Sequence, residues 1–345
     1  MDFADGHRGR NGRARHASDP GRTLCDMALP TGMTLRQETS ADIPALVALG
    51  DETWSSLYGR TGYVTAELLE MGLQRPGRDA QRDDPVIFAG DRLVAGAALQ
   101  AWPPMTEVVS PILIDLALSP GDRSACIDAL IRALQDAARA HLTDADATVE
   151  RVIGLNVPTR DTGLRDHVRG LGWTLLRTYF ELSIDLTDGS FPDVEWPEGM
   201  AMRMFGDPAV VEPTIDVMTE AFADHHGDFA SPDTWRHWLT ADTVIPDASY
   251  LLDDADGPLG GLVSADFGDG EGFIVAVGVR RRGRGRGAAS ALLRRSFHDL
   301  ASAGFATASL SVDGENTTGA LGLYERAGMS MRVATEAWVT PLHLA

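Results

Sequence analysis

A predicted order of strands and helices occurs twice along this 345-residue chain, and this repetition is the strongest constraint on its fold. Each copy begins with a strand and a helix, continues through a hairpin, a strand, a helix and a strand, and ends with a short helix and a closing strand. Met33-Thr-Leu-Arg36 also parallels Met200-Ala-Met-Arg203, and residues 169–173 parallel residues 325–329. Pieces this short also match by chance, but the shared element order favours duplication. The sequence therefore predicts two tandem units of an α/β fold, in which helices cover a mixed sheet of the α+β kind.

The limits of the two units follow from the composition around them. Residues 1–32 are polar and rich in Gly and Arg, without periodicity, so we expect a disordered tail. The first unit is expected over residues 33–187 and the second over residues 199–345. The segment 188–198 carries prolines, glycines and acidic residues and is predicted to be a linker. Internal methionines near the beginning leave the true start of translation open.

The charge and the cysteine content restrict the class of protein. The formal net charge is -20, which argues against binding to nucleic acid, favours solubility and can attract cationic ligands. No apolar stretch reaches the roughly 20 residues of a membrane span, and the N-terminal region lacks the apolar core of a secretory signal. Two cysteines do not make a disulfide framework, and no Cys/His spacing is typical of a metal site. We therefore expect a cytoplasmic protein with no metal and no nucleic-acid or membrane partner.

The segment 277–293 carries the clearest chemical signal in the sequence. An apolar strand leads directly into alternating Gly and Arg and then into an apolar-faced helix. Gly283, Gly285 and Gly287 permit positive φ and close approach to a ligand, and successive N–H groups at a helix N-terminus can form a nest for an anion. A pyrophosphate site is therefore predicted. The alternatives are a plain surface turn, an RNA-binding Arg-Gly segment, and a dinucleotide fingerprint, whose glycine spacing differs from this one.

The strand, the R-x-x-G-x-A loop and the helix resemble motif A of the GNAT superfamily of acyl-CoA N-acyltransferases. Two registers fit the loop, one from Arg282 and one from Arg284, and the spacing between the strand and the helix selects the second. The resemblance implies acetyl-CoA as co-substrate, with its pyrophosphate on loop N–H groups and its pantetheine arm along the strand. The residues expected to bind it are Val277, Gly278, Val279, Arg284, Gly285, Arg286, Gly287, Ala288 and Ala289.

A second segment, residues 316–329, looks like motif B of the same superfamily. The resemblance implies that Asn316 contacts the cofactor and that Tyr324 protonates the departing thiolate. The residue pattern alone also allows structural roles, since Tyr324 falls on an apolar helix face and Asn316 can cap that helix. With motif A upstream, the catalytic role of Tyr324 is favoured.

The acceptor side of the predicted site is less specified. Glu271, just before the strand, is the first candidate for the general base, and a solvated loop acid is the alternative reading. His225 and His226 follow the first helix of the second unit, where this superfamily often shapes the acceptor pocket, and a surface loop is the alternative there. In the first unit, Asp122 occupies the turn that corresponds to the phosphate loop, and Val168 stands in the place of Tyr324. We therefore expect the first unit to be degenerate.

Together these features predict an N-acetyltransferase that moves an acetyl group from acetyl-CoA directly to a primary amine of a small molecule in a ternary complex. The alternatives are a non-catalytic acyl-CoA sensor or scaffold and a protein N-acetyltransferase. The two-unit plan is similar to that of the mycothiol synthase family, although Phe273 stands where that family has an acid. The acceptor, the acyl length and the choice between monomer and homodimer stay open.

Overall fold

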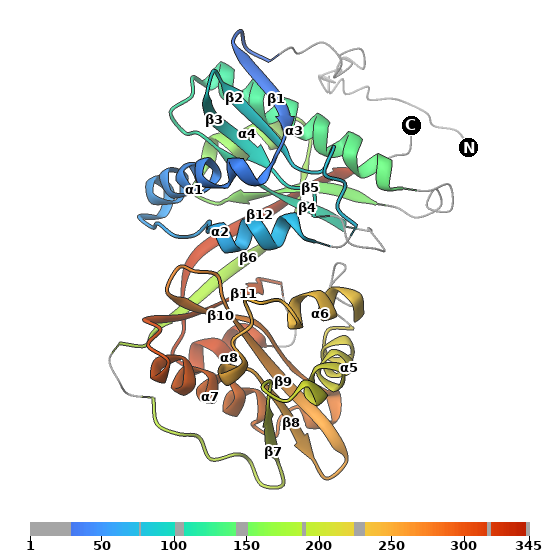
Figure 1. Ribbon diagram of the computed structural model, residues 1–345, viewed down its shortest axis with the longest axis vertical. Helices are drawn as coiled ribbons and strands as arrows, with labels where there is room; N and C mark the ends of the chain where they lie inside the picture. Colours follow the sequence, from blue (N-terminus) through green and yellow to red (C-terminus); the bar gives the residue numbers. More distant parts are fainter. Residues whose placement is uncertain are drawn as a thin grey trace, which may run out of the picture.

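The computed structural model describes residues 29–75, 77–100, 107–142, 151–187, 191–223, 232–315 and 319–342. Within these residues the chain forms one mixed sheet of twelve strands, with helices against both faces (Figure 1). The expected disordered tail lies almost entirely outside the described residues, as do Asn316, His225 and His226. No helix in the described ranges is long and apolar enough to cross a membrane.

The first unit contributes one half of the sheet and the helices that cover it. Its strands are β1 (Met33–Gln37), β2 (Pro85–Ala89), β3 (Arg92–Ala97), β4 (Glu107–Ile114), β5 (Val152–Pro158) and β6 (Thr174–Asp185). Its helices are α1 (Ile43–Tyr58), α2 (Ala66–Leu73), α3 (Pro120–His141) and α4 (Thr162–Gly170).

The second unit repeats this order of elements. Its strands are β7 (Ala201–Met204), β8 (Tyr250–Asp254), β9 (Gly257–Asp266), β10 (Glu271–Val279), β11 (Thr307–Asp313) and β12 (Ser330–Pro341). Its helices are α5 (Val211–Ala221), α6 (Pro232–Leu239), α7 (Ala288–Ser302) and α8 (Ala320–Arg326). The prediction of two tandem units with an α/β mixed sheet is confirmed.

The closing strands of the two units are exchanged. The strand order across the sheet is β1-β2-β3-β4-β5-β12-β6-β11-β10-β9-β8-β7. β6, which ends the first unit, therefore lies between β12 and β11, and β12 lies between β5 and β6. Figure 1 shows both strands crossing the middle of the molecule, where the upper and lower halves meet. Each half of the sheet is thus completed by a strand from the other unit.

The register of the exchanged strands has the symmetry of a duplication. Tyr179 of β6 pairs with Asp313 of β11, and Thr335 of β12 pairs with Pro158 of β5. Tyr179 and Thr335 also pair with each other, at the middle of the antiparallel β6–β12 contact. The two units are therefore related by an approximate two-fold axis through this pair, which a chance similarity of short segments would not produce.

Two hydrophobic cores, one in each unit, include a side chain from the closing strand of the other unit. One core packs α3 and α4 against the first unit's strands and includes Trp338, which comes from β12. Another packs α7 and α8 against the second unit's strands and includes Leu182, which comes from β6. Both side chains are buried, and burial of a large apolar side chain is worth about 1.5–3 kcal/mol. The exchange therefore ties the stability of each core to the other unit.

Two short helices, α2 and α6, are not among the elements expected from the sequence. Each has only eight residues, and α2 buries none of its side chains completely. Thr65 caps the start of α2 by accepting a hydrogen bond from the N–H of Leu68. In Figure 1, α2 lies at the lower edge of the upper half and α6 at the upper edge of the lower half. These helices lie on either side of the space between the two units.

Candidate functional site

β10 and β11 separate soon after they begin, and this opening positions the site. The two parallel strands pair only from Glu271 to Phe273. On its other side, β10 continues to pair with β9 as far as Val279. Alternate backbone N–H and C=O groups of β10 beyond Phe273 therefore face away from β9, with no neighbouring strand among the described residues, and such groups are available to an extended ligand.

A bulge in β10 changes which face its side chains occupy. The register with β9 shifts between Ile274 and Ala276, so the alternation of side chains is interrupted there. Before the bulge, Phe273 lines a cavity between the two units, whereas Ile274 packs towards α7. After the bulge, Val277 packs with the α7 cluster instead. The side chains that line the cavity therefore come from the start of the strand, whereas Val277 and Val279 pack with the α7 cluster beyond the bulge.

The loop from β10 to α7 has backbone features that an anion nest requires. Gly285 and Gly287 have φ of 75° and 84°. A Cβ on Gly283 would lie 2.6 Å from a side-chain carbon of Leu259, so only glycine fits there. α7 begins at Ala288 without a side-chain cap, and its first N–H groups are left for another acceptor. All nine residues expected to bind the cofactor lie along this strand, loop and helix start.

The loop arginines are engaged by neighbouring groups. Arg282 and Arg286 donate to the two carboxylate oxygens of Asp254 at 2.6 and 2.7 Å. These hydrogen bonds lower the pKa of Asp254 to about 2. Arg280 pairs with Glu220 at 2.7 Å. The arginine side chains thus hold the loop in place, and main-chain N–H groups are the main donors that the loop offers to a pyrophosphate.

Tyr324 lies on α8, among the side chains that fill the space between α7 and the sheet. It is 8% exposed and packs in the same cluster as Leu310 and Val312. Burial raises the pKa of the Tyr324 hydroxyl to about 12, so this group is neutral and keeps its proton at pH 7. Asn316, the other residue expected in this motif, lies outside the described residues.

A cavity of about 620 Å³ is lined by residues of both units. On the second unit, its walls come from β10, β11, β12 and α6, and on the first unit from α1, α2, β4 and β5. The second-unit residues include Thr234, His237, Trp238, Phe267, Asp269, Glu271, Phe273, Val275, Ser309, Ser311 and Arg332. The base candidate Glu271 thus reaches the cavity, whereas His225 and His226 lie outside the described residues.

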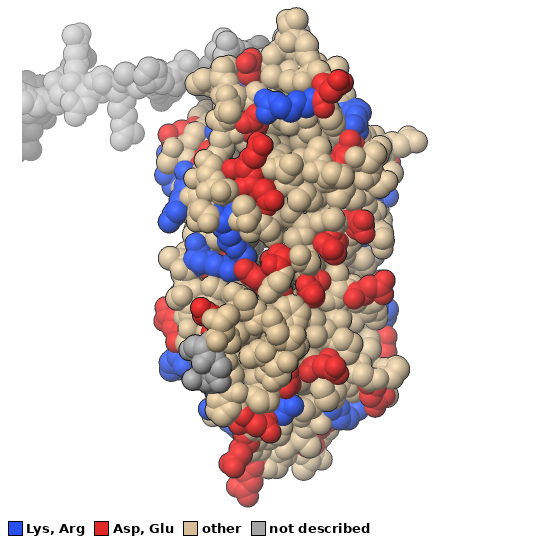
Figure 2. All heavy atoms as spheres, turned by 60° about the vertical axis from the view of Figure 1, so that its left-hand side comes forward, with Lys and Arg blue, Asp and Glu red and all other residues tan. Residues whose placement is uncertain are grey.

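Four charged side chains meet in the wall of this cavity. Arg60, from the loop after α1, donates to Glu181 and to Glu271, both at 2.7 Å. Arg332 donates to the same two carboxylates, at 2.6 Å to Glu181 and 2.8 Å to Glu271. On the face drawn in Figure 2, basic and acidic side chains lie next to one another at mid-height, where the two halves meet. The network joins the first unit to the start of β10.

The surroundings of Glu271 determine its charge. Burial acts to raise the pKa of Glu271, but Arg332 and Arg60 outweigh burial and lower it. Ser309 also donates to its second oxygen at 3.3 Å. Glu271 is therefore ionised at neutral pH but is a weak base. His237 lines the same cavity, and burial lowers the pKa of its imidazole, so it is neutral at pH 7.

Sequence reasoning missed Arg60, Arg332, Glu181 and His237. Arg60 and His237 belong to no motif. Glu181 and Arg332 lie on strands that the sequence does predict, but only the exchange of those strands brings them together. No local pattern indicates that exchange.

The first unit's counterpart of the phosphate loop has a different chemistry. Ser119 caps α3 by accepting a hydrogen bond from the N–H of Asp122, and Asp122 places a carboxylate in the first turn. The counterpart of Tyr324 is the fully buried Val168. One N–H group of this helix start is thus satisfied by a side chain, and the Asp122 carboxylate would repel phosphate, as expected for a degenerate unit.

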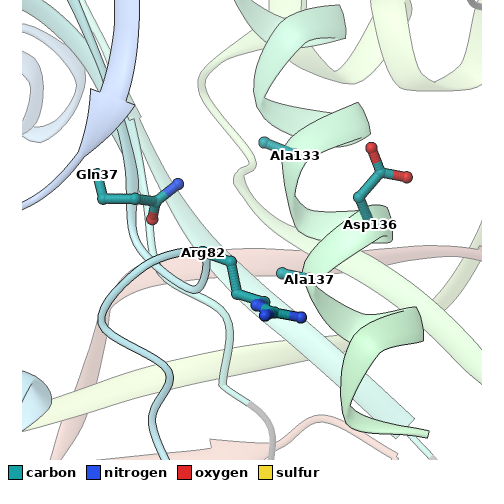
Figure 3. A pocket seen from close by; sticks show the side chains of 5 residues that line it. All are labelled: Gln37, Arg82, Ala133, Asp136 and Ala137. Carbon is teal, nitrogen blue, oxygen red and sulfur yellow. The ribbon is translucent and has the colours of Figure 1, made fainter.

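A smaller hollow of about 320 Å³ lies on the first unit, between β1 and α3 (Figure 3). Its lining residues are Gln37, Arg82, Ala133, Asp136 and Ala137. Its two charges are paired locally, Arg82 with Asp79 and Asp136 with Arg139. Because it lacks a nest and an unpaired charge, we place the functional site at β10.

Comparisons with known proteins agree with this placement. Residues 214–329 match the sequence model of the acetyltransferase (GNAT) family. No curated protein sequence matches the chain. Among solved structures, a GCN5-related N-acetyltransferase from Sphaerobacter thermophilus is 26% identical with a TM-score of 0.74, over 92% of this chain and 98% of that one.

A tandem GNAT protein from the clavulanic acid biosynthesis pathway has the same overall fold. It is 12% identical with a TM-score of 0.67, over 91% of this chain and 99% of that one. Residues 214–329, which include β10, the loop and α7, therefore form an acetyltransferase domain of the GNAT family, and the two-unit fold of the chain is that of known GNAT structures.

Proposed function

We propose that the protein transfers an acetyl group from acetyl-CoA directly to a primary amine of a small molecule. One observation carries this proposal: the free edge of β10 leads at one end to an uncapped helix start and at the other to a walled cavity. The first end suits a pyrophosphate and a pantetheine arm. The second suits an acceptor that reaches the thioester from the side of the cavity.

Acetyl-CoA would be held mainly by main-chain groups. N–H groups from Gly285 to Ala289 would bind the pyrophosphate, helped by the positive end of the α7 dipole, since the N–H of Arg284 already donates to the carbonyl of Arg281. The backbone of Val277 and Val279 would pair with the pantetheine amides as an added strand does. N–H groups of the same strand would stabilise the negative charge that develops on the thioester oxygen during attack.

The acceptor must lose a proton before it can attack, because an alkyl ammonium has a pKa of about 10.4. We retain Glu271 as the first candidate for proton acceptor, since its carboxylate is ionised and lines the cavity. Its low basicity suits a group that orients the ammonium and passes the proton on to solvent. The neutral His237 is the second candidate.

Tyr324 is the proposed acid for the departing thiolate. A neutral, buried hydroxyl can give its proton to the sulfur when the tetrahedral species collapses, after which solvent restores it. No protein nucleophile is required, which agrees with a direct transfer. The two-unit walls of the cavity favour a small-molecule acceptor over a protein N-terminus, since an acceptor in this space is largely enclosed.

The test is CoA release from acetyl-CoA across a panel of amines, with Tyr324→Phe beside the wild type. We expect Tyr324→Phe to lower kcat by roughly 10²–10⁴-fold while CoA still binds, because general acid catalysis contributes about that much. Tyr250→Phe is the matched control, since Tyr250 is a buried tyrosine of the same core whose hydroxyl donates to Asp299. Normal turnover in Tyr324→Phe would remove it as the acid. CoA binding without release for any amine would favour a sensor or scaffold instead.

A further inference from the structure

The cavity does not end at the second unit but continues into the first. Val109 and Pro111 of β4 and Asn156 of β5 line it there. The strand registers make these residues the counterparts of Phe273, Val275 and Ser311 on the acceptor side of β10. The first unit has thus lost its anion nest but has kept an acceptor-side space. We call this space the first-unit lobe and define it by Glu38, Leu46, Val109, Pro111 and Asn156.

Glu38 is an unusual residue to line such a space, because its carboxyl group is buried. Its side chain is 8% exposed, and its Oε1 atom is fully buried without a hydrogen-bond partner among the described residues. The two nearby arginines donate to Asp84 instead of Glu38, Arg75 at 2.7 Å and Arg78 at 2.6 Å. Glu38 is therefore a buried carboxyl with no salt bridge in the described structure. A group of this kind is costly unless something pairs with it.

The electrostatics of Glu38 favour a cationic partner. Burial and the neighbouring charge of Asp84 raise the pKa of Glu38 to about 7, although Arg78 and Arg75 act in the opposite direction. An approaching cation would stabilise the ionised form and pair with it. The negative charge of the whole chain acts in the same direction.

Much of the cavity lining is apolar. Trp54 of α1, Leu68 and Leu69 of α2, and Leu113 of β4 belong to it. Leu69 and Leu113 pack both with Leu46 of the first-unit lobe and with the cluster of Trp54. A hydrocarbon spacer would be buried favourably against these side chains. A volume of about 620 Å³ accommodates an elongated small molecule rather than a short amine alone.

We propose that the first-unit lobe binds the far end of the acceptor, and that Glu38 receives a second cationic group there. The preferred acceptor is then an elongated compound with an ammonium or guanidinium group at one end and the reacting amine at the other. This inference rests on the proposed function, because it assigns the acceptor class for the same site. Glu38 would set specificity without touching the reacting atoms.

The test compares α,ω-diamines with monoamines of equal chain length, using kcat/KM for acetyl transfer. In the wild type, we expect long diamines to be preferred over the matched monoamines. Glu38→Gln should lower kcat/KM for the diamines by about 10- to 100-fold, since a hydrogen bond to a charged group is worth about 1.5–3 kcal/mol. The same variant should leave the monoamines almost unchanged. Glu70→Gln, on the exposed face of α2, is the matched control and should change neither class.

A direct binding measurement separates this inference from the proposed function. Calorimetric titration of the full chain with a diamine and with its matched monoamine should show weaker diamine binding in Glu38→Gln than in the wild type. If amines are acetylated but diamines have no advantage, the inference fails and the proposed function stands. If no amine is acetylated but diamines bind through Glu38, the proposed function fails and the diamine site stands. Equal losses for both amine classes in Glu38→Gln would overturn the inference.

Discussion

At the scale of single residues, the carboxylates in the cavity wall differ in whether they have a charged partner. Glu271 and Glu181 share Arg60 and Arg332, whereas Glu38 has no such partner in the described structure. Removing one member of a partly buried network leaves an uncompensated charge, so these four residues are constrained together. Glu38 is free of that constraint, and its titration should be visible in the stability of the protein.

We expect the stability contribution of Glu38 to fall as the pH rises. Its pKa is about 7 in the folded state and near 4.5 in the unfolded state, so the folded state binds more protons between these values. Stability is then highest below the unfolded pKa and is lost as the pH rises through 7. A pKa that differs by one between the folded and unfolded states corresponds to about 1.4 kcal/mol. The free energy of unfolding of Glu38→Gln, relative to that of the wild type, should therefore rise by about 2–3 kcal/mol when the pH is raised from about 5 to about 8.5.

Urea unfolding of the wild type and Glu38→Gln at both pH values measures this gain, because the other titrating groups are common to both proteins. Glu70→Gln should show no such difference, since Glu70 is exposed. A constant difference between the wild type and Glu38→Gln across the range would mean that the Glu38 carboxyl is ionised in the folded state at both pH values.

At the scale of elements, the junction between β10 and α7 combines three features that are each ordinary alone. Among the described residues, β10 has no strand on its β11 side beyond Phe273, Gly285 and Gly287 turn the chain through positive φ, and α7 starts without a side-chain cap. Because main-chain N–H groups are the chief donors here, the conformation of the glycines should matter more than the charge of any one arginine.

Gly287→Val tests the importance of this conformation. A β-branched side chain at a φ of 84° is strained by about 1–3 kcal/mol, and relief of the strain would displace the N–H groups of the nest. We expect the Kd for CoA, measured by calorimetry, to rise by about tenfold or more. Gly304→Val is the matched control, because Gly304 has a φ of 92° at the other end of α7. Equal CoA affinity in Gly287→Val and wild type would show that the nest does not carry the pyrophosphate.

Much of this junction was predictable from the sequence, whereas the wall of the cavity between the two units was not. The glycines, the apolar strand and the helix follow from local backbone preferences, which act over a few residues. Helices α2 and α6 are only eight residues long, so periodicity barely distinguishes them from loops. The contact of Arg60 with Glu271 joins residues 211 positions apart and depends on how the two units pack. No spacing along the chain records such a contact.

At the scale of the whole molecule, the exchanged strands make the two units interdependent. A simple reading of the sequence places a linker at residues 188–198 and a separate unit on either side. The sheet instead alternates β5, β12, β6 and β11, so a strand of each unit is enclosed by the other. The exchange also places Glu181 and Arg332 in the shared cavity wall, and so the shape of the cavity depends on both units.

We expect residues 1–190 and 191–345, produced as separate chains, to associate into a 1:1 complex. β6 would pair with β11 and β12 as in the intact chain, and Leu182 and Trp338 would each enter the other unit's core. The buried apolar area and the strand pairing favour this complex over two separate halves, each of which would complete its sheet with its own last strand. The ion pair between Arg60 and Glu271 also stabilises the complex, because it crosses the interface.

Light scattering on a mixture of the two chains measures the association. Arg60→Gln should weaken the complex, whereas Arg82→Gln, whose exposed side chain pairs locally with Asp79 in the first unit, should not. Two independent monomers in the mixture would mean that each unit can close its sheet with its own last strand.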